Sequence, residues 1–233
     1  MLVFKDIDPI IVGYIESMSD FRNLLFVNKY CNKMVTDNKF FQEWKFLDSI
    51  DKINFLNACK FGCLNISKYL FTENNAANEC AFRWSCFKGH LEVCKFLIQI
   101  DKNIDIHALN EQAFRWSCRY GHLEVCKFLI QLDKNIDIHA ANEEAFRWSC
   151  YNGHLEVCKF LIHLDKNIDI HAENEEAFRW SCSNGHLEVC KFLIQLDMNI
   201  DIHAKNEEAF RLSKENEHFE VYNFLIQLDK KID

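Results

Sequence analysis

At 233 residues, the chain is long enough for one elongated domain or for a small domain joined to a larger one. Hydrophobic residues make up 49% and charged residues 27%, a balance that excludes an intrinsically disordered chain. The formal net charge of -8 argues against binding nucleic acid or a membrane surface through bulk charge. The 12 cysteines occur without a secretion signal or a long apolar run, so we expect reduced thiols and a cytoplasmic location.

Residues 1–50 are predicted to form a compact run of short helices, because apolar residues recur there at helical spacing. The pattern consists of Pro9, Ile11 and Ile15, then Leu24 and Val27, then Trp44. It resembles an F-box, the motif that docks onto the adaptor Skp1 of cullin-type ubiquitin ligases. The resemblance implies that these six residues form the core of the motif or face the adaptor. The alternative is a helical cap that only protects the following unit from water.

A period of 32 residues dominates the rest of the chain. The motif "AFRWSC" begins at Ala81, Ala113, Ala145 and Ala177, and it becomes "AFRLSK" at Ala209. Such self-similarity is typical of stacked units that mainly contact their neighbours. The sequence therefore predicts a helical domain or cap over 1–50, a degenerate repeat over 51–78, four repeats over 79–205 and a C-terminal capping repeat over 206–233.

The first half of each unit is predicted to be a helix. In one unit, Asn142 precedes this helix, and its side chain can accept a hydrogen bond from the free N–H groups of the first turn. Phe146, Ser149 and Cys150 then share one helical face. Gly153 is expected to end the helix in a left-handed conformation.

The second half of each unit is predicted to be a second helix that begins directly after the Gly-His pair. Its apolar stripe is Leu155, Cys158, Leu161 and Ile162, and the segment "LDKNID" ends it. Only 6 glycines and 1 proline are present, which favours helices joined by short loops over a β fold with many turns. The expected fold class is therefore all-α.

Each unit also carries the pattern Cys-x3-His-x3-Cys, for example Cys150, His154 and Cys158. A structural zinc ion requires four ligands, and the pattern supplies three. The histidines of "IDIHA", at His107, His139, His171 and His203, could supply the fourth, but they lie at the opposite end of the unit. We therefore expect the cysteines to pack as small apolar residues and the histidine to satisfy backbone groups at the turn, with no metal or cofactor.

The segments "GHLEVCKFLI" and "NIDIHA" resemble the ankyrin repeat, whose usual forms are "GHLEVVKLLL" and "GADVNA". The resemblance extends over Asp51–Asp233 and places Cys150 in an alanine position and Cys158 in a valine position. It implies a solenoid of five to six helix pairs that binds a protein target on its concave surface.

Two details depart from the usual ankyrin form. The period is one residue short, and the turn glycine before the first helix is absent, so a short loop is expected in place of the projecting β-turn. The first helix follows the pattern N-x-x-A-F-R-W-S, for example from Asn142 to Ser149. This pattern is similar to that of ankyrin proteins encoded by giant DNA viruses, which would imply a location in the host cytoplasm.

The repeats differ from one another mainly at two places, which we expect to contact the target. The first place is the pair before Gly-His, at Phe87, Lys88, Arg119, Tyr120, Tyr151, Asn152, Ser183 and Asn184. The second is the residue before the repeated Asn, at Leu109, Ala141, Glu173 and Lys205. Aromatic and arginine side chains in a row are typical of interface anchors. Drift at unconstrained surface positions is the alternative.

The arginine of "AFRWSC" is predicted to form a ladder with neighbouring acids, and the tryptophan to pack between units. The sequence contains no G-x-S-x-G, P-loop or HExxH motif, so we do not expect an enzyme. The leading hypothesis is a target-binding solenoid that acts as a substrate adaptor of a ubiquitin ligase through the F-box-like segment. A plain interaction module, or a metal-binding or redox protein, are the alternatives.

Overall fold

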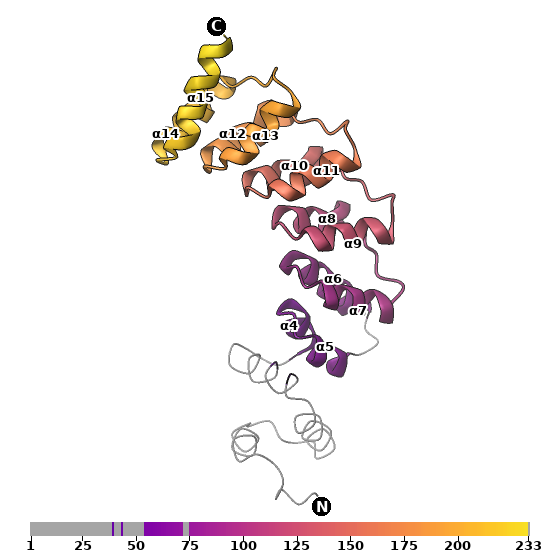
Figure 1. The fold of residues 1–233 in the computed structure, drawn as a ribbon. Coiled ribbons are helices and arrows are strands. Elements are labelled where there is room, and N and C mark those ends of the chain that lie inside the picture. Colours follow the sequence, from indigo (N-terminus) through magenta and orange to yellow (C-terminus); the bar gives the residue numbers. More distant parts are fainter. Residues whose placement is uncertain (1–38, 40–42, 44–53, 72–74, 233) are drawn as a thin grey trace, which may run out of the picture. The chain divides into compact units, whose positions relative to one another are not determined.

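The computed structural model describes Lys39, Glu43, residues 54–71 and residues 75–232. The chain divides into two compact units, Met1–Glu73 and Asn74–Asp233. The described part contains twelve helices and no strand (Figure 1). Within these residues, no helix combines the length and the apolar character needed to cross a membrane.

The described part of the first unit centres on two short helices, α4 (Phe55–Lys60) and α5 (Leu64–Leu70), which pack against each other. Asn54 caps α4 by accepting a hydrogen bond from the backbone N–H of Asn57 at 2.8 Å. The carboxylate of Glu43 accepts from the backbone N–H groups of Asn65 and Ile66, at 2.9 and 3.2 Å. A negative charge is stabilising at this end of a helix, because the free N–H groups there point toward it.

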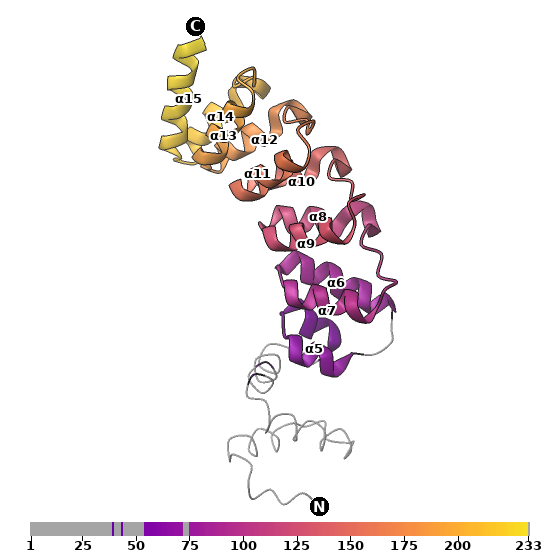
Figure 2. The same ribbon diagram turned by 45° about the vertical axis from the view of Figure 1, so that its right-hand side comes forward.

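The second unit is a row of helix pairs (Figures 1 and 2). In chain order the pairs are α6 (Asn75–Lys88) with α7 (Leu91–Ile100), α8 (Ala108–Arg119) with α9 (Leu123–Leu132), α10 (Ala140–Tyr151) with α11 (Leu155–Leu164), α12 (Ala172–Ser183) with α13 (Leu187–Leu196), and α14 (Ala204–Glu215) with α15 (Phe219–Ile232). Each first helix packs on its partner and on the first helices of adjacent pairs, and the second helices pack in the same way. The predicted all-α solenoid of helix pairs is confirmed.

The core of each pair is formed by the residue types that the helical spacing indicates. In α10, Phe146, Ser149 and Cys150 are fully buried. The predicted stripe of α11 needs a correction, because Leu155 and Ile162 are only half-buried. Val157 takes the buried position beside Cys158 and Leu161, since the helix faces both its own partner and the neighbouring pairs.

The predicted asparagine cap of the first helices is wrong. Ala141, Asn142 and Glu143 all have left-handed backbone angles, with φ of 57°, 58° and 61°, and the same turn occurs at the corresponding residues of α8, α12 and α14. The N–H of Glu143 donates to the carbonyl of His139 at 3.1 Å and closes this turn. Asn occupies the middle of the turn because Asn tolerates positive φ better than most residues with a side chain.

The connections between pairs are short loops, as expected, and each contains tight turns, for example at residues 166–167 and 170–171. Asp165 and Asp169 each fold the chain locally by accepting a hydrogen bond from the backbone N–H two residues later, at 2.7 and 3.0 Å. Ile168 and Ile170, which stand on either side of Asp169, are buried. The loop is therefore anchored by two apolar side chains and shaped by two carboxylates.

Candidate protein-binding surface

A row of aromatic rings follows the C-terminal ends of the first helices. We call it the aromatic row and define it as Trp84, Phe87, Trp116, Tyr120, Trp148, Tyr151 and Trp180. Phe87 lies 5.2 Å from Trp84 of its own repeat and 5.4 Å from Trp116 of the next, measured between ring centroids. Tyr151 lies in the same way between Trp148 and Trp180, at 4.9 and 5.3 Å. These offset and edge-to-face contacts are the favourable geometries for aromatic pairs.

Arg119 occupies the position equivalent to Phe87 and Tyr151, and it joins the two halves of the aromatic row. The guanidinium carbon lies 3.6 Å from the ring centroid of Trp148 and 5.6 Å from that of Tyr120. The ammonium of Lys88 lies 4.6 Å above the ring of Phe87. The structure therefore interleaves two cations with the rings, and Tyr120 keeps 39% of its surface exposed.

The aromatic row ends toward the C-terminus. Ser183 stands at the position of the rings of Phe87 and Tyr151, three residues after Trp180. Asn216 Nδ2 donates to the carbonyl oxygen of Ser183 at 2.9 Å. Leu212 stands where the tryptophan would be. The surface therefore changes from aromatic and cationic in the earlier repeats to polar in the last one.

The two predicted groups of target-binding residues do not come together. The group before Gly-His lies at the C-terminal ends of the first helices, beside the aromatic row. Leu109, Ala141, Glu173 and Lys205 are exposed, and they lie at the opposite ends of those helices, inside the left-handed turns. The structure thus presents two separate stripes, of which only the first contains a continuous aromatic surface.

The predicted packing role of the cysteines is confirmed. Cys86, Cys118, Cys150 and Cys182 of the first helices are fully buried, and each faces a fully buried cysteine of the partner helix with Sγ atoms 3.4–3.6 Å apart. Burial raises the pKa of these four first-helix thiols well above the usual range, which disfavours the thiolate that metals and electrophiles require. Among the described residues, no group of three or more His, Cys, Asp or Glu side chains could hold a metal ion.

The histidines His122, His154 and His186 of the Gly-His pairs pack against the glycine of the preceding repeat. His122 Nε2 lies 3.0 Å from the carbonyl oxygen of Phe87 and donates to it. Burial lowers the pKa of His122, so that the neutral ring is favoured. A Cβ atom at Gly89 would come within 2.4 Å of the His122 ring, and Gly89 also has φ of 75°. Glycine is therefore required here for two reasons: the backbone has positive φ, and the histidine of the next repeat leaves no room for a side chain.

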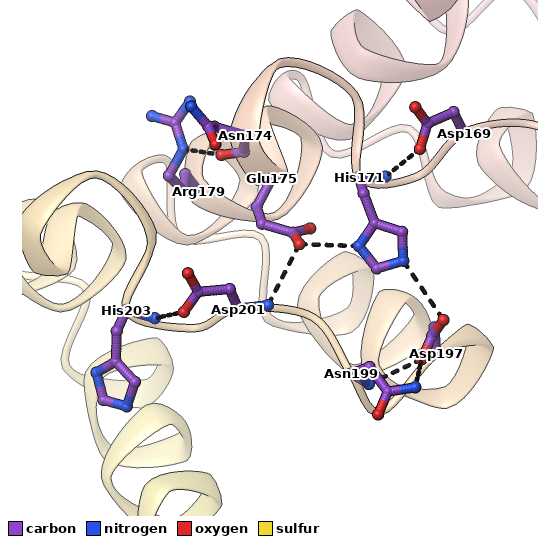
Figure 3. A network of polar contacts seen from close by, with 9 residues as sticks. All are labelled: Asp169, His171, Asn174, Glu175, Arg179, Asp197, Asn199, Asp201 and His203. Carbon is purple, nitrogen blue, oxygen red and sulfur yellow. Dashed lines mark hydrogen bonds and ion pairs between the residues drawn. The ribbon is translucent and has the colours of Figure 1, made fainter.

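A polar network ties each loop to the first helix before it (Figure 3). His171 Nδ1 donates to Glu175 Oε1 at 2.8 Å, and Nε2 donates to Asp197 at 3.4 Å. Glu175 Oε1 also accepts from the backbone N–H of Asp201 in the loop that follows, at 3.3 Å. These carboxylates raise the pKa of His171, because hydrogen bonding to both nitrogens stabilises the imidazolium. Equivalent networks centre on His107 and His139.

The arginine ladder is confirmed, and its members link consecutive repeats. Arg115, Arg147 and Arg179 form ion pairs with Glu144, Glu176 and Glu208 of the next repeat. Each guanidinium also donates to carbonyl oxygens of its own left-handed turn, as Arg179 Nε does to Asn174 at 2.6 Å (Figure 3). Arg83 instead pairs with Glu79 of its own helix, and Gln112 stands where the next glutamate would be.

The aromatic row was only partly predictable. The tryptophans were expected to pack between units, and contacts of 6.2 Å for Trp84–Trp116 and 5.1 Å for Trp148–Trp180 confirm this. The sequence did not reveal that the variable residue three positions later fills the gap between successive tryptophans. Helical spacing of i and i+3 was the available signal.

The predicted adaptor-binding residues Pro9, Ile11, Ile15, Leu24, Val27 and Trp44 lie outside the described residues. The F-box interpretation and the boundaries assigned to the domains therefore stay predictions.

Comparison with known proteins agrees with this architecture. The family model for ankyrin repeats (three copies) matches residues 55–142, 98–174 and 146–233. The chain is similar to the X-ray structure of an ankyrin repeat family protein from Legionella pneumophila, with 30% sequence identity and a TM-score of 0.50. That match covers 57% of this chain and 39% of the Legionella chain, so this chain spans well under half of that protein. No curated protein matches the sequence. The chain belongs to the ankyrin-repeat family.

Proposed function

We propose that the chain binds a protein target through the aromatic row and the variable residues beside it. Ankyrin repeats are protein-protein interaction modules. The row of mostly half-buried rings, whose two halves are joined by Arg119, is the observation that supports this choice of surface. Aromatic side chains contribute most to binding where water is already partly excluded around them. Selectivity would come from the residues that differ between repeats. The chain would act by holding its target, with no chemistry of its own.

The repeats themselves supply substitutions that test this proposal without disturbing the fold. Ser183 shows that a serine is accommodated at the position of Phe87, Arg119 and Tyr151. A triple variant with Phe87→Ser, Arg119→Ser and Tyr151→Ser therefore removes the variable part of the surface. Peptides selected from a phage-displayed random library on the full chain should bind this variant at least ~10-fold more weakly, because each truncated anchor costs about 1 kcal/mol or more.

The second stripe provides the matched control. Ala141 shows that alanine fits the left-handed turn, so Leu109→Ala, Glu173→Ala and Lys205→Ala are combined in a control variant. The selected peptides should bind this control as they bind the natural chain. Loss of binding in the control, with binding retained by the triple serine variant, would move the target site to the other stripe.

A more specific function rests on the sequence pattern of residues 9–44. If this segment is an F-box, the chain delivers its bound target to a cullin-type ubiquitin ligase through Skp1. If the chain derives from a giant DNA virus, this would occur in the host cytoplasm. Purified full chain should then recover purified Skp1 in a pull-down, and Pro9→Ala with Leu24→Asp should abolish the recovery. Failure of the natural chain to recover Skp1 would leave the N-terminal segment as a cap.

A further inference from the structure

Arg119 differs from every other arginine in the part of the chain that the structure describes. The other arginines form ion pairs with glutamates, as set out for Arg83, Arg115, Arg147, Arg179 and Arg211. The guanidinium of Arg119 lies against the rings of Trp148 and Tyr120 and forms no ion pair with a described residue. Among the described residues, a guanidinium group without an anionic partner therefore lies in the middle of the aromatic row.

The stacking of Arg119 on Trp148 holds the guanidinium in place without using its hydrogen-bond donors. A guanidinium that lies 3.6 Å from a ring centroid covers the ring with its face. Its N–H groups point along the plane and match the two oxygens of a carboxylate. Because Arg119 is half-buried among rings, an ion pair formed there is screened less by water than one on an open surface.

We propose that Arg119 is the carboxylate-binding point of the aromatic row and that the protein target presents an acidic side chain there, flanked by apolar residues. This inference rests on the proposed function. Lys88 on the neighbouring repeat adds a second cation, so the local charge is opposite to the net charge of -8. Two cations on an acidic chain suit a single carboxylate better than a nucleic acid, which requires many phosphate contacts.

The internal repeats offer a substitution that removes the charge and keeps the packing. Tyr151 fills the equivalent seam and lies 4.9 Å from Trp148 and 5.3 Å from Trp180. Arg119→Tyr should therefore fold and keep the aromatic row continuous. Arg211→Tyr is the matched control, because it makes the same change of residue and net charge at an exposed position of α14.

The test uses peptides selected from a phage-displayed random dodecapeptide library on the full natural chain. Each selected peptide is compared with a twin in which its shared acidic residue becomes Asn or Gln. We expect the change to weaken binding to the natural chain and to Arg211→Tyr about 10-fold or more, and to leave binding to Arg119→Tyr unchanged. A circular dichroism melt of each variant confirms that it is folded.

Other results overturn the inference and are distinguishable from failure of the proposed function. Selected peptides without a shared acidic residue, or an acid whose effect persists in Arg119→Tyr, would refute the carboxylate site and leave target binding intact. Peptides that bind the triple serine variant with the same affinity as the natural chain would refute both the carboxylate site and the proposed binding surface. Selection of no peptide would also refute both. Arg119-dependent binding of a fluorescent single-stranded 20-mer oligonucleotide, without peptide discrimination, would assign the site to phosphate.

Discussion

The inner repeats and the last repeat have similar backbone conformations. Their side chains differ at positions where an inner repeat contacts the repeat that follows it. Gly153 has φ of 74° and lies against the ring of His186, whereas Glu217 has φ of 62° at the same position and is exposed. Arg147 reaches the next repeat, whereas Arg211 pairs with a glutamate of its own helix. The residues that the inner repeats share are therefore required largely by the contact with the following repeat. The helix pair itself accepts other residues at these positions.

The largest expected effect comes from placing a Cβ in an inner junction. Gly153→Ala should lower the free energy of unfolding by about 2–4 kcal/mol, because the residue keeps positive φ and its Cβ meets His186 Nδ1 at 2.5 Å. Urea unfolding followed by circular dichroism measures the change. Glu217→Gly is the counterpart in the last repeat. It should stabilise the chain by about 0.5–1 kcal/mol, because the relief of positive φ exceeds the extra chain entropy that glycine loses on folding. Equal destabilisation by Gly153→Ala and Glu217→Ala would contradict the role given to the following histidine.

A smaller effect is expected from the arginine ladder. Glu176→Gln removes the charge from a pair whose side chains are largely buried and should cost about 1–2 kcal/mol of stability in the same urea assay. Gln112→Glu restores the missing partner of Arg83 and should stabilise that junction. Glu215→Gln, in the exposed pair with Arg211, should cost less than about 0.5 kcal/mol. Equal losses of stability for Glu176→Gln and Glu215→Gln would contradict the distinction between inner and terminal ion pairs.

The smallest effect is a dependence on pH. Glu143 and Asp165 raise the pKa of His139 above its ordinary value, so the folded chain binds this proton more tightly than the unfolded chain. The stabilisation is then complete below the unfolded pKa and is lost as the pH rises through the folded pKa. His139→Gln should therefore cost more stability at about pH 6 than at about pH 8. The more exposed His203 should show a weaker dependence in the same urea titrations.

The sequence predicted the helix pairs, the buried thiols and the arginine ladder, because each depends on spacing along a helix and on the repeat period. It did not predict the left-handed turns at Asn142 and its equivalents, because asparagine before a helix is also the signature of a cap. The half-buried state of Leu155 could not be read from one helix, since the neighbouring pairs decide which face is covered. Arg119 could be placed at the surface, but its stacking on Trp148 depends on the next repeat.

Residues that contact each other across a junction are separated by about one repeat along the sequence. His122 lies 33 residues after Gly89, and Glu144 lies 29 residues after Arg115, so every link reaches one unit along and no further. Excising or duplicating one inner 32-residue block leaves the same partners facing each other at the new boundary. Unequal recombination within the gene can thus lengthen or shorten the protein in whole repeats, shifting the variable side chains without requiring a new fold.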